Sequence, residues 1–183
     1  MLNDISDTLK ISDLTYKVVA FSEISNFNAD ECVDWATEMI FLGYDTPSLR
    51  ILAGLDKPTN FFEVTGYLPE VLSSLNLTQK MGDEATLSYC SYYIKKIANS
   101  DNIRNNLTHV YQFCQARDYE KLVYNFYLLH WAWDDIDYGN DYTPYWESAK
   151  KDNIEKIVVD TAIKWAEENE QHYTQHRVWQ NGG

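Results

Sequence analysis

Apolar residues recur every three or four positions along most of the chain, the spacing of one face of an α-helix. The clearest stripe lies in 29–42 and predicts a helix there. Similar stripes predict helices over 60–76, 87–97 and 103–114. Further stripes lie at Leu49, Leu52 and Ala53, at Leu122, Phe126, Leu129, Trp133 and Ile136, and at Ile154, Ile157, Val158, Thr161 and Trp165.

Several predicted helices begin with a capping side chain, which accepts a hydrogen bond from the first helical turn. Asn28 with Glu31, and Asn60 with Glu63, have the spacing of a capping box. Thr46 before Pro47 fits a cap followed by proline at the first helical position. The remaining predicted starts and stops are Asp118, Asp152 with Glu155, Gly43, Gly54 and Gly139-Asn140.

Two segments give conflicting signals. Gly66 and Pro69 interrupt the 60–76 stripe, and an interior proline costs about 3 kcal/mol, so a kink or a break is expected there. The β-branched and aromatic residues of 14–21 also suit a strand. Because no partner strand is evident, the segment is interpreted as helical, with the strand left open as an alternative.

Together these elements predict an all-α fold. We expect a single domain over 1–183, with seven or eight helices in an irregular bundle or a short solenoid of antiparallel helix pairs. Residues 174–183 are expected to form a loosely ordered tail.

The net charge of −13 disfavours binding to nucleic acid or an anionic membrane and favours a basic protein partner. Acidity that serves only solubility is the alternative explanation. Cys32, Cys90 and Cys114 have apolar or aromatic neighbours, as reduced core thiols do. With no signal peptide and no apolar run of about 18 residues, a cytoplasmic location is expected.

Candidate catalytic and metal-binding patterns are weak. His130 and Asp134 are four residues apart, as are His172 and His176, but neither Glu-x-x-His nor His-Glu-x-x-His occurs. No nucleophile motif or glycine-rich phosphate loop is present either. We therefore expect no enzymatic activity, no catalytic residue, no metal site and no cofactor.

The segment 131–147, WAWDDIDYGNDYTPYWE, holds five acids, six aromatic residues and no base. Its first half continues the predicted helix, and its second half forms a loop, where binding residues are common. Tyrosine and tryptophan give stiff contact area, and carboxylates complement lysine or arginine. The alternative is that the rings pack under the loop. The candidate partner-binding residues are Trp131, Asp134, Asp135, Asp137, Tyr138, Asp141, Tyr142, Tyr145, Trp146 and Glu147.

The stretch GYDTPSLRILAGL at 43–55, after the helix that contains Trp35, resembles bacterial immunity proteins of polymorphic or contact-dependent toxin systems. The resemblance covers about 28–77, and Arg50 is expected to pair with a carboxylate. It implies an all-helical, non-catalytic inhibitor whose acidic surface covers a basic toxin. It assigns no functional residue.

The leading hypothesis is therefore an acidic protein-binding inhibitor, an immunity protein that neutralises a cognate toxin by direct binding. Two other classes stay open. One is an enzyme or small-ligand-binding helical domain with an aromatic-lined cleft. The other is a helical adaptor that offers a groove to a peptide. Burial of the aromatic surface in a homo-oligomer is a further alternative.

Overall fold

The computed structural model describes residues 8–173 and 175–176. Eight α-helices form this part of the chain, which confirms the all-α class and the predicted number of helices. The α-helices are α1 Thr15–Val18, α2 Asp30–Phe41, α3 Pro47–Ala53, α4 Phe61–Ser74, α5 Gly82–Ala98, α6 Ile103–Ala116, α7 Tyr124–Asp137 and α8 Ile154–Asn169. The short elements are the 3₁₀ turns η1 Phe21–Glu23 and η2 Lys121–Val123 and the two-residue strands β1 Thr8–Leu9 and β2 Gln175–His176.

The chain divides into two compact units. Unit 1 combines the residues up to Met81 with those from His172 onward, and unit 2 comprises Gly82–Gln171. The single domain over 1–183 stays a prediction. Most of the predicted tail at 174–183 lies outside the described residues, but Gln175 and His176 pair antiparallel with Leu9 and Thr8.

In unit 1, α3 and α4 begin where the capping residues predict. The Thr46 hydroxyl accepts a hydrogen bond from the Leu49 N–H at 3.3 Å, ahead of Pro47. The Asn60 side chain accepts one from the Glu63 N–H at 2.8 Å. These bonds satisfy N–H groups that have no partner within the helix, so both predicted caps are confirmed.

Helix α4 runs without a break from Phe61 to Ser74, so of the expected kink or break at Pro69 the break is wrong, and the kink stays a prediction. Pro69 itself is exposed, whereas Leu68, Val71 and Leu72 beside it are buried. Burial of this apolar face on both sides of the proline outweighs the lost backbone hydrogen bond. In 14–21 the helical interpretation is confirmed by the single turn of α1, and the strand alternative is wrong.

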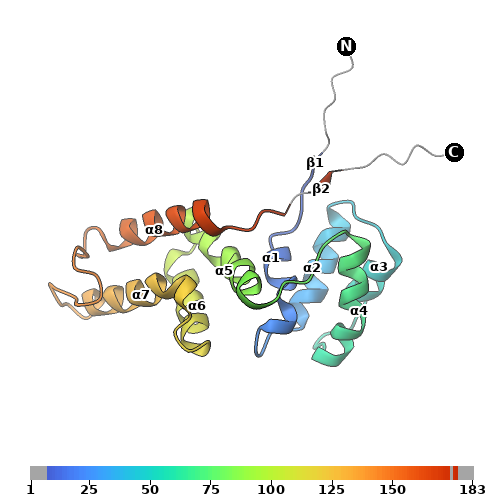
Figure 1. The fold of residues 1–183 in the computed structure, drawn as a ribbon, viewed down its shortest axis with the longest axis horizontal. Coiled ribbons are helices and arrows are strands. Elements are labelled where there is room, and N and C mark those ends of the chain that lie inside the picture. Colours follow the sequence, from blue (N-terminus) through green and yellow to red (C-terminus); the bar gives the residue numbers. More distant parts are fainter. Residues whose placement is uncertain (1–7, 174, 177–183) are drawn as a thin grey trace, which may run out of the picture. The chain divides into compact units, whose positions relative to one another are not determined.

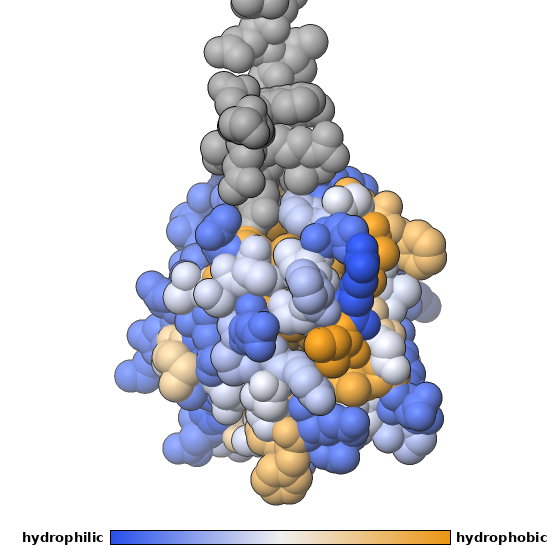
Figure 2. Space-filling model, turned by 90° about the vertical axis from the view of Figure 1, so that its right-hand side faces the viewer, coloured by the Kyte–Doolittle hydropathy of each residue, from blue (hydrophilic) through white to orange (hydrophobic). Residues whose placement is uncertain are grey.

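The core of unit 1 is a cluster of mainly aliphatic side chains around Trp35. Trp35 is fully buried, and its indole N–H donates to the Thr15 hydroxyl at 2.9 Å. The buried Lys17 ammonium donates to Glu31 at 2.6 Å. On the surface drawn in Figure 2, apolar side chains occur in separate places among hydrophilic ones.

The predicted pairing of Arg50 with a carboxylate is confirmed. Arg50 donates from Nε and Nη2 to the two oxygens of Asp45 at 2.6 and 2.5 Å. The hydrogen bond from Arg50 lowers the pKa of Asp45. Both side chains are exposed, so the pair is a local surface contact in the turn that leads into α3.

Unit 2 is built from α5 to α8 (Figure 1). Helix α5 packs on α6 and α8, and α7 also packs on both of these helices. The predicted stripes supply the core: Cys90, Ile94, Ile97, Leu107, Val110, Cys114, Phe126, Leu129, Ile136, Ile154, Val158 and Trp165 are buried. The Trp165 indole N–H donates to the Leu122 carbonyl at 2.8 Å, which fixes α8 to η2, just before α7.

Two predicted caps in unit 2 are wrong. Asp118 has a positive φ of 55° and its N–H bonds back to Gln115, so it belongs to the turn that ends α6. The cap of η2 is instead Glu120, which accepts from the Leu122 N–H at 3.3 Å. At α8 the residue before the helix is Asn153, whose side chain accepts from the Lys150 N–H at 2.7 Å.

Candidate functional site

The segment 131–147 continues α7 to Asp137 and then leaves it as a loop, as predicted. Tyr138 follows the last helical residue, and Gly139 adopts a φ of 92°. The N–H groups of Tyr138, Gly139 and Asn140 bond back to carbonyls of the last helical turn. A positive φ suits glycine, and its position explains why the helix stops here.

Six predicted residues are exposed at the end of α7 and on the loop. The Tyr138 and Tyr142 side chains are 88% and 65% exposed, and Tyr145 is 38% exposed. Asp137, Asp141 and Glu147 are exposed as well. We call these six residues the acidic tyrosine loop. Tyrosine rings and carboxylates are thus both accessible to a partner. The alternative that all the rings pack under the loop does not fit this exposure.

The other four predicted residues, Trp131, Asp134, Asp135 and Trp146, are half-buried. The first three contact neighbours within unit 2. Asp135 accepts a hydrogen bond from the buried Thr143 hydroxyl at 2.8 Å, and that hydroxyl also accepts from the Tyr145 N–H at 3.3 Å. Trp131 stacks on Tyr145 with ring centroids 6.0 Å apart. These contacts fasten the loop to α7, so Asp135 and Trp131 shape the surface instead of presenting free groups to a partner.

Asp134 belongs to a charged cluster between α6 and α7. Arg104 donates from Nη2 to one oxygen of Asp134, and Nη2 lies 3.9 Å from Asp137. The Arg104 guanidinium also lies over the Trp133 ring, 5.1 Å from its centre. On the other side, His130 Nδ1 is 3.5 Å from the second Asp134 oxygen. Asp134 and Asp135 therefore point to different partners, as adjacent helical residues do.

His130 is a buried imidazole at the end of a stack of rings. It stacks on Tyr111 at 4.0 Å, Tyr111 stacks on Tyr127 at 5.3 Å, and Tyr127 stacks on Tyr124 at 5.5 Å. Neither His130 Nδ1 nor the buried Arg104 Nη1 has a hydrogen-bond partner within the described structure. Burial lowers the pKa of His130, while Asp134 raises it and Arg104 lowers it. The imidazole is therefore neutral at pH 7.

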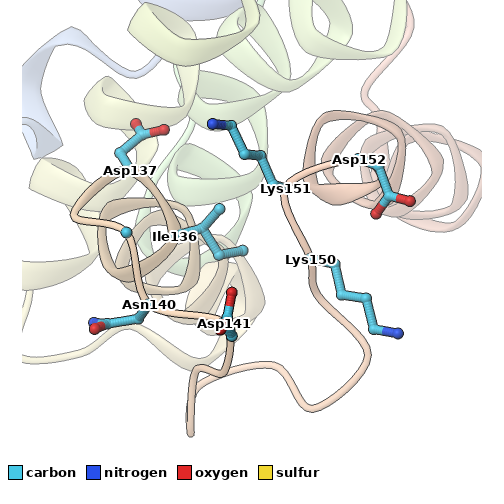
Figure 3. A pocket seen from close by; sticks show the side chains of 8 residues that line it. Ile136, Asp137, Asn140, Asp141, Lys150, Lys151 and Asp152 are labelled. Carbon is cyan, nitrogen blue, oxygen red and sulfur yellow. The ribbon is translucent and has the colours of Figure 1, made fainter.

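A pocket of about 570 Å³ lies between the end of α7 and the segment that leads into α8. Figure 3 shows Ile136 and Asp141 pointing into this space, with Lys151 reaching across it from the opposite side. Its lining is Ile136, Asp137, Gly139, Asn140, Asp141, Lys150, Lys151 and Asp152. Lys150 and Lys151 partly offset the negative charge of the three aspartates that line this pocket. A second hollow of about 400 Å³ is lined by Tyr145, Trp146, Glu147 and Ser148.

The three cysteines are buried and unfavourable for thiolate chemistry. Burial is the largest cause of a raised thiol pKa at Cys32, Cys90 and Cys114, and the pKa of Cys114 reaches about 11. A thiolate is the reactive form of cysteine, so these side chains are poor nucleophiles at neutral pH.

His130 and Asp134, four residues apart on α7, belong to the charged cluster with Arg104. Within the described residues, no group of three or more histidine, cysteine, aspartate or glutamate side chains has the arrangement of metal ligands. His172 is exposed in unit 1. The expectation that the protein uses no metal stays a prediction.

Comparison with known proteins gives no relative from which a role is transferred: no family model, curated protein or solved structure matches this chain significantly. None of the helices in the described part combines the length and the apolar character needed to cross a membrane.

Sequence reasoning missed the residues that hold the site together. Arg104 is 30 residues from Asp134 and on another helix, and no local pattern indicates that pairing. Thr143 is one hydroxyl in a polar loop, and only its burial marks it as an anchor. Lys150 and Lys151 form an adjacent basic pair just beyond residue 147. This pair is visible in the sequence and could have indicated the positive side of the pocket.

Proposed function

We propose that this protein is a non-catalytic inhibitor that binds a basic protein through its acidic tyrosine loop, in the manner of an immunity protein that neutralises a cognate toxin. The observation that carries the proposal is the exposure, on one short segment, of three tyrosines and three carboxylates: Asp137, Tyr138, Asp141, Tyr142, Tyr145 and Glu147.

The composition of this loop suits recognition of a cationic surface. A tyrosine side chain buries a large area while losing few rotamers, and tyrosine is enriched among the residues that dominate interface energies. Carboxylates beside the rings complement lysine and arginine and accelerate encounter with a basic partner. The net charge of −13 adds a long-range attraction for such a partner and a repulsion for nucleic acid and anionic membranes.

The loop is also held in place before a partner arrives. Thr143 joins it to Asp135, and Tyr145 stacks on Trp131, so both anchors lie between the exposed residues and α7. A surface that is ordered in advance loses less conformational entropy on binding. This supports a direct-binding inhibitor over a segment that folds only on its partner.

The small-ligand alternative has one observation in its favour, the hollow lined by Tyr145 and Trp146. Its lining also includes Glu147 and Ser148, so a cationic ligand is the best match to its chemistry. The larger pocket has no aromatic lining and five charged residues. It therefore does not fit the expected aromatic-lined cleft. A helical adaptor that binds a peptide remains a variant of the same protein-binding proposal.

The test is calorimetric titration of the protein with the purified product of the adjacent gene. We expect a complex that weakens as salt concentration rises, because exposed ion pairs are screened. Replacing Asp137→Asn together with Asp141→Asn should weaken binding about tenfold or more. The matched control is Glu167→Gln with Glu168→Gln, which removes the same charge from exposed positions at the end of α8.

Two further results decide between the alternatives. Replacing Tyr138→Ala and Tyr142→Ala should weaken the complex as well, mainly by faster dissociation. Equal effects of the Asp137/Asp141 pair and the Glu167/Glu168 pair would show that only total charge matters and would refute the assigned surface. Light scattering of the free protein tests whether the aromatic surface is buried in a homo-oligomer. A homodimer that loses stability on the tyrosine replacements would place these rings in a self-interface.

A further inference from the structure

The buried His130 imidazole has the position of a sensor beside the acidic tyrosine loop. Only 9% of the residue is exposed, and its Nδ1 has no hydrogen-bond partner within the described structure. Nevertheless, Nδ1 lies 3.5 Å from an Asp134 oxygen, just beyond hydrogen-bond reach. Protonation places a hydrogen on both ring nitrogens and would turn this near contact into a charged hydrogen bond.

Asp134 lies between two groups, each of which faces a different oxygen of its carboxylate. Its other oxygen accepts from Arg104 Nη2, and the same Nη2 lies 3.9 Å from Asp137, one of the exposed carboxylates of the loop. Arg104 Nη1 is buried and unpartnered. A shift of the guanidinium toward Asp137 would exchange one carboxylate for the other.

The charged and titratable groups around His130 come from both helices of the seam. Helix α6 contributes Arg104 and Tyr111, and α7 contributes Asp134. Among the described residues, Asp134 and Arg104 are the charged groups that shift the pKa of His130. Burial raises the pKa of Tyr111, so this phenol stays neutral throughout the acidic and neutral range.

We propose that His130 makes docking at the acidic tyrosine loop sensitive to pH, an inference that rests on the proposed function. When His130 takes up a proton from solvent, it draws Asp134 toward Nδ1, and Arg104 moves onto Asp137. Asp137 is then neutralised by an internal partner, and the loop offers a cationic protein one carboxylate fewer. Conversely, a docked cationic partner holds Asp137 and keeps His130 neutral.

The sign of the effect follows from linkage. A cation bound at the loop disfavours the charged form of His130, so the pKa of His130 is lower in the complex than in the free protein. Binding therefore releases a proton and weakens as pH falls below the pKa of the free protein, itself lowered by burial. A unit charge about 8 Å away shifts a pKa by roughly half a unit, which corresponds to a change in Kd of about threefold.

The experiment uses an octa-arginine peptide as the cationic probe. Its Kd is measured by calorimetry at pH 7.5 and at pH 5.5 for the wild-type protein and His130→Gln. The control is His109→Gln, the same change at an exposed histidine of α6 that stacks on Tyr93. We expect the Kd to rise more on acidification in the wild type and the control than in His130→Gln, by up to about threefold, the limit reached when His130 is fully protonated.

A second measurement needs no variant at His130. The pKa of His130 in the wild-type protein is followed by NMR of the imidazole nitrogens, with and without the peptide. A lower pKa in the presence of the peptide supports the coupling, and an unchanged pKa overturns it. This arm remains decisive even if His130→Gln fails to fold.

The outcomes separate this inference from the proposed function. Peptide binding that is indifferent to Asp137→Asn with Asp141→Asn refutes both, because the loop is then not the docking surface. Binding that requires these two carboxylates but has the same pH dependence in the wild type and in His130→Gln refutes the sensor alone.

Discussion

Unit 1 and the α6–α7 seam of unit 2 use polar groups in different ways. In unit 1, Thr46 and Asn60 start α3 and α4 through side-chain hydrogen bonds, whereas α1 and α2 have no such cap. Its core is one buried, mainly aliphatic cluster. In unit 2, α6, α7 and α8 have no side-chain cap, and the α6–α7 seam holds stacked rings and an Arg104–Asp134 pair. The first region is organised for stability, whereas the second keeps charge and aromatic surface at the solvent boundary.

The largest expected effect is on the free energy of unfolding, when one tryptophan of each region is replaced by alanine. Trp35→Ala empties a fully buried site in unit 1 and should lower the free energy of unfolding by about 3–5 kcal/mol. Trp131→Ala in the half-buried seam should cost less than about 2 kcal/mol. Urea denaturation followed by circular dichroism measures both. Similar losses for the two variants would remove the proposed distinction between the regions.

An intermediate effect is expected at the charged cluster. Asp134→Asn leaves the partly buried Arg104 guanidinium without its carboxylate and should destabilise the protein by about 1–3 kcal/mol. Asp137→Asn, which changes a largely exposed carboxylate 3.9 Å from Arg104, should stay within about 0.5 kcal/mol. The midpoints of urea unfolding report both values. A large effect at Asp137 would mean that it supports the fold and is not available for docking.

The smallest effect tests the caps of unit 1. Asn60→Ala removes the hydrogen bond to the Glu63 N–H and should cost about 1 kcal/mol. The same replacement at the exposed Asn125 of α7 should stay within about 0.5 kcal/mol. The comparison is made on urea unfolding midpoints at pH 7. If Asn125→Ala were as costly as Asn60→Ala, side-chain caps would not distinguish the two regions.

Local signals account for what the sequence predicted well. The helix stripes, the caps at Thr46 and Asn60 and the stop at Gly139 each depend on residues a few positions apart. Helix α4 does not break at Pro69 for a non-local reason: the burial of Leu68, Val71 and Leu72 by distant residues overrides a local penalty. Tertiary contacts are not visible in a short sequence window.

The candidate site shows the same division. Its exposed half was predictable, since Tyr138, Asp141 and Tyr142 follow a helix stop in a polar loop. Its internal half was not, because Asp134 pairs with Arg104 across 30 residues and Asp135 with a single buried threonine. A count of acids in 131–147 therefore overstates the carboxylates that a partner can reach.

Unit 1 is formed by two stretches that are far apart in the sequence, and this has a consequence for its biosynthesis. Thr8 and Leu9 pair with His176 and Gln175, and Tyr16 contacts Tyr173 with ring centroids 5.1 Å apart. All of unit 2 lies between these stretches in the chain. A ribosome therefore releases the helices of unit 2 before it supplies the last contacts of unit 1, so the first unit to begin folding is the last to be completed.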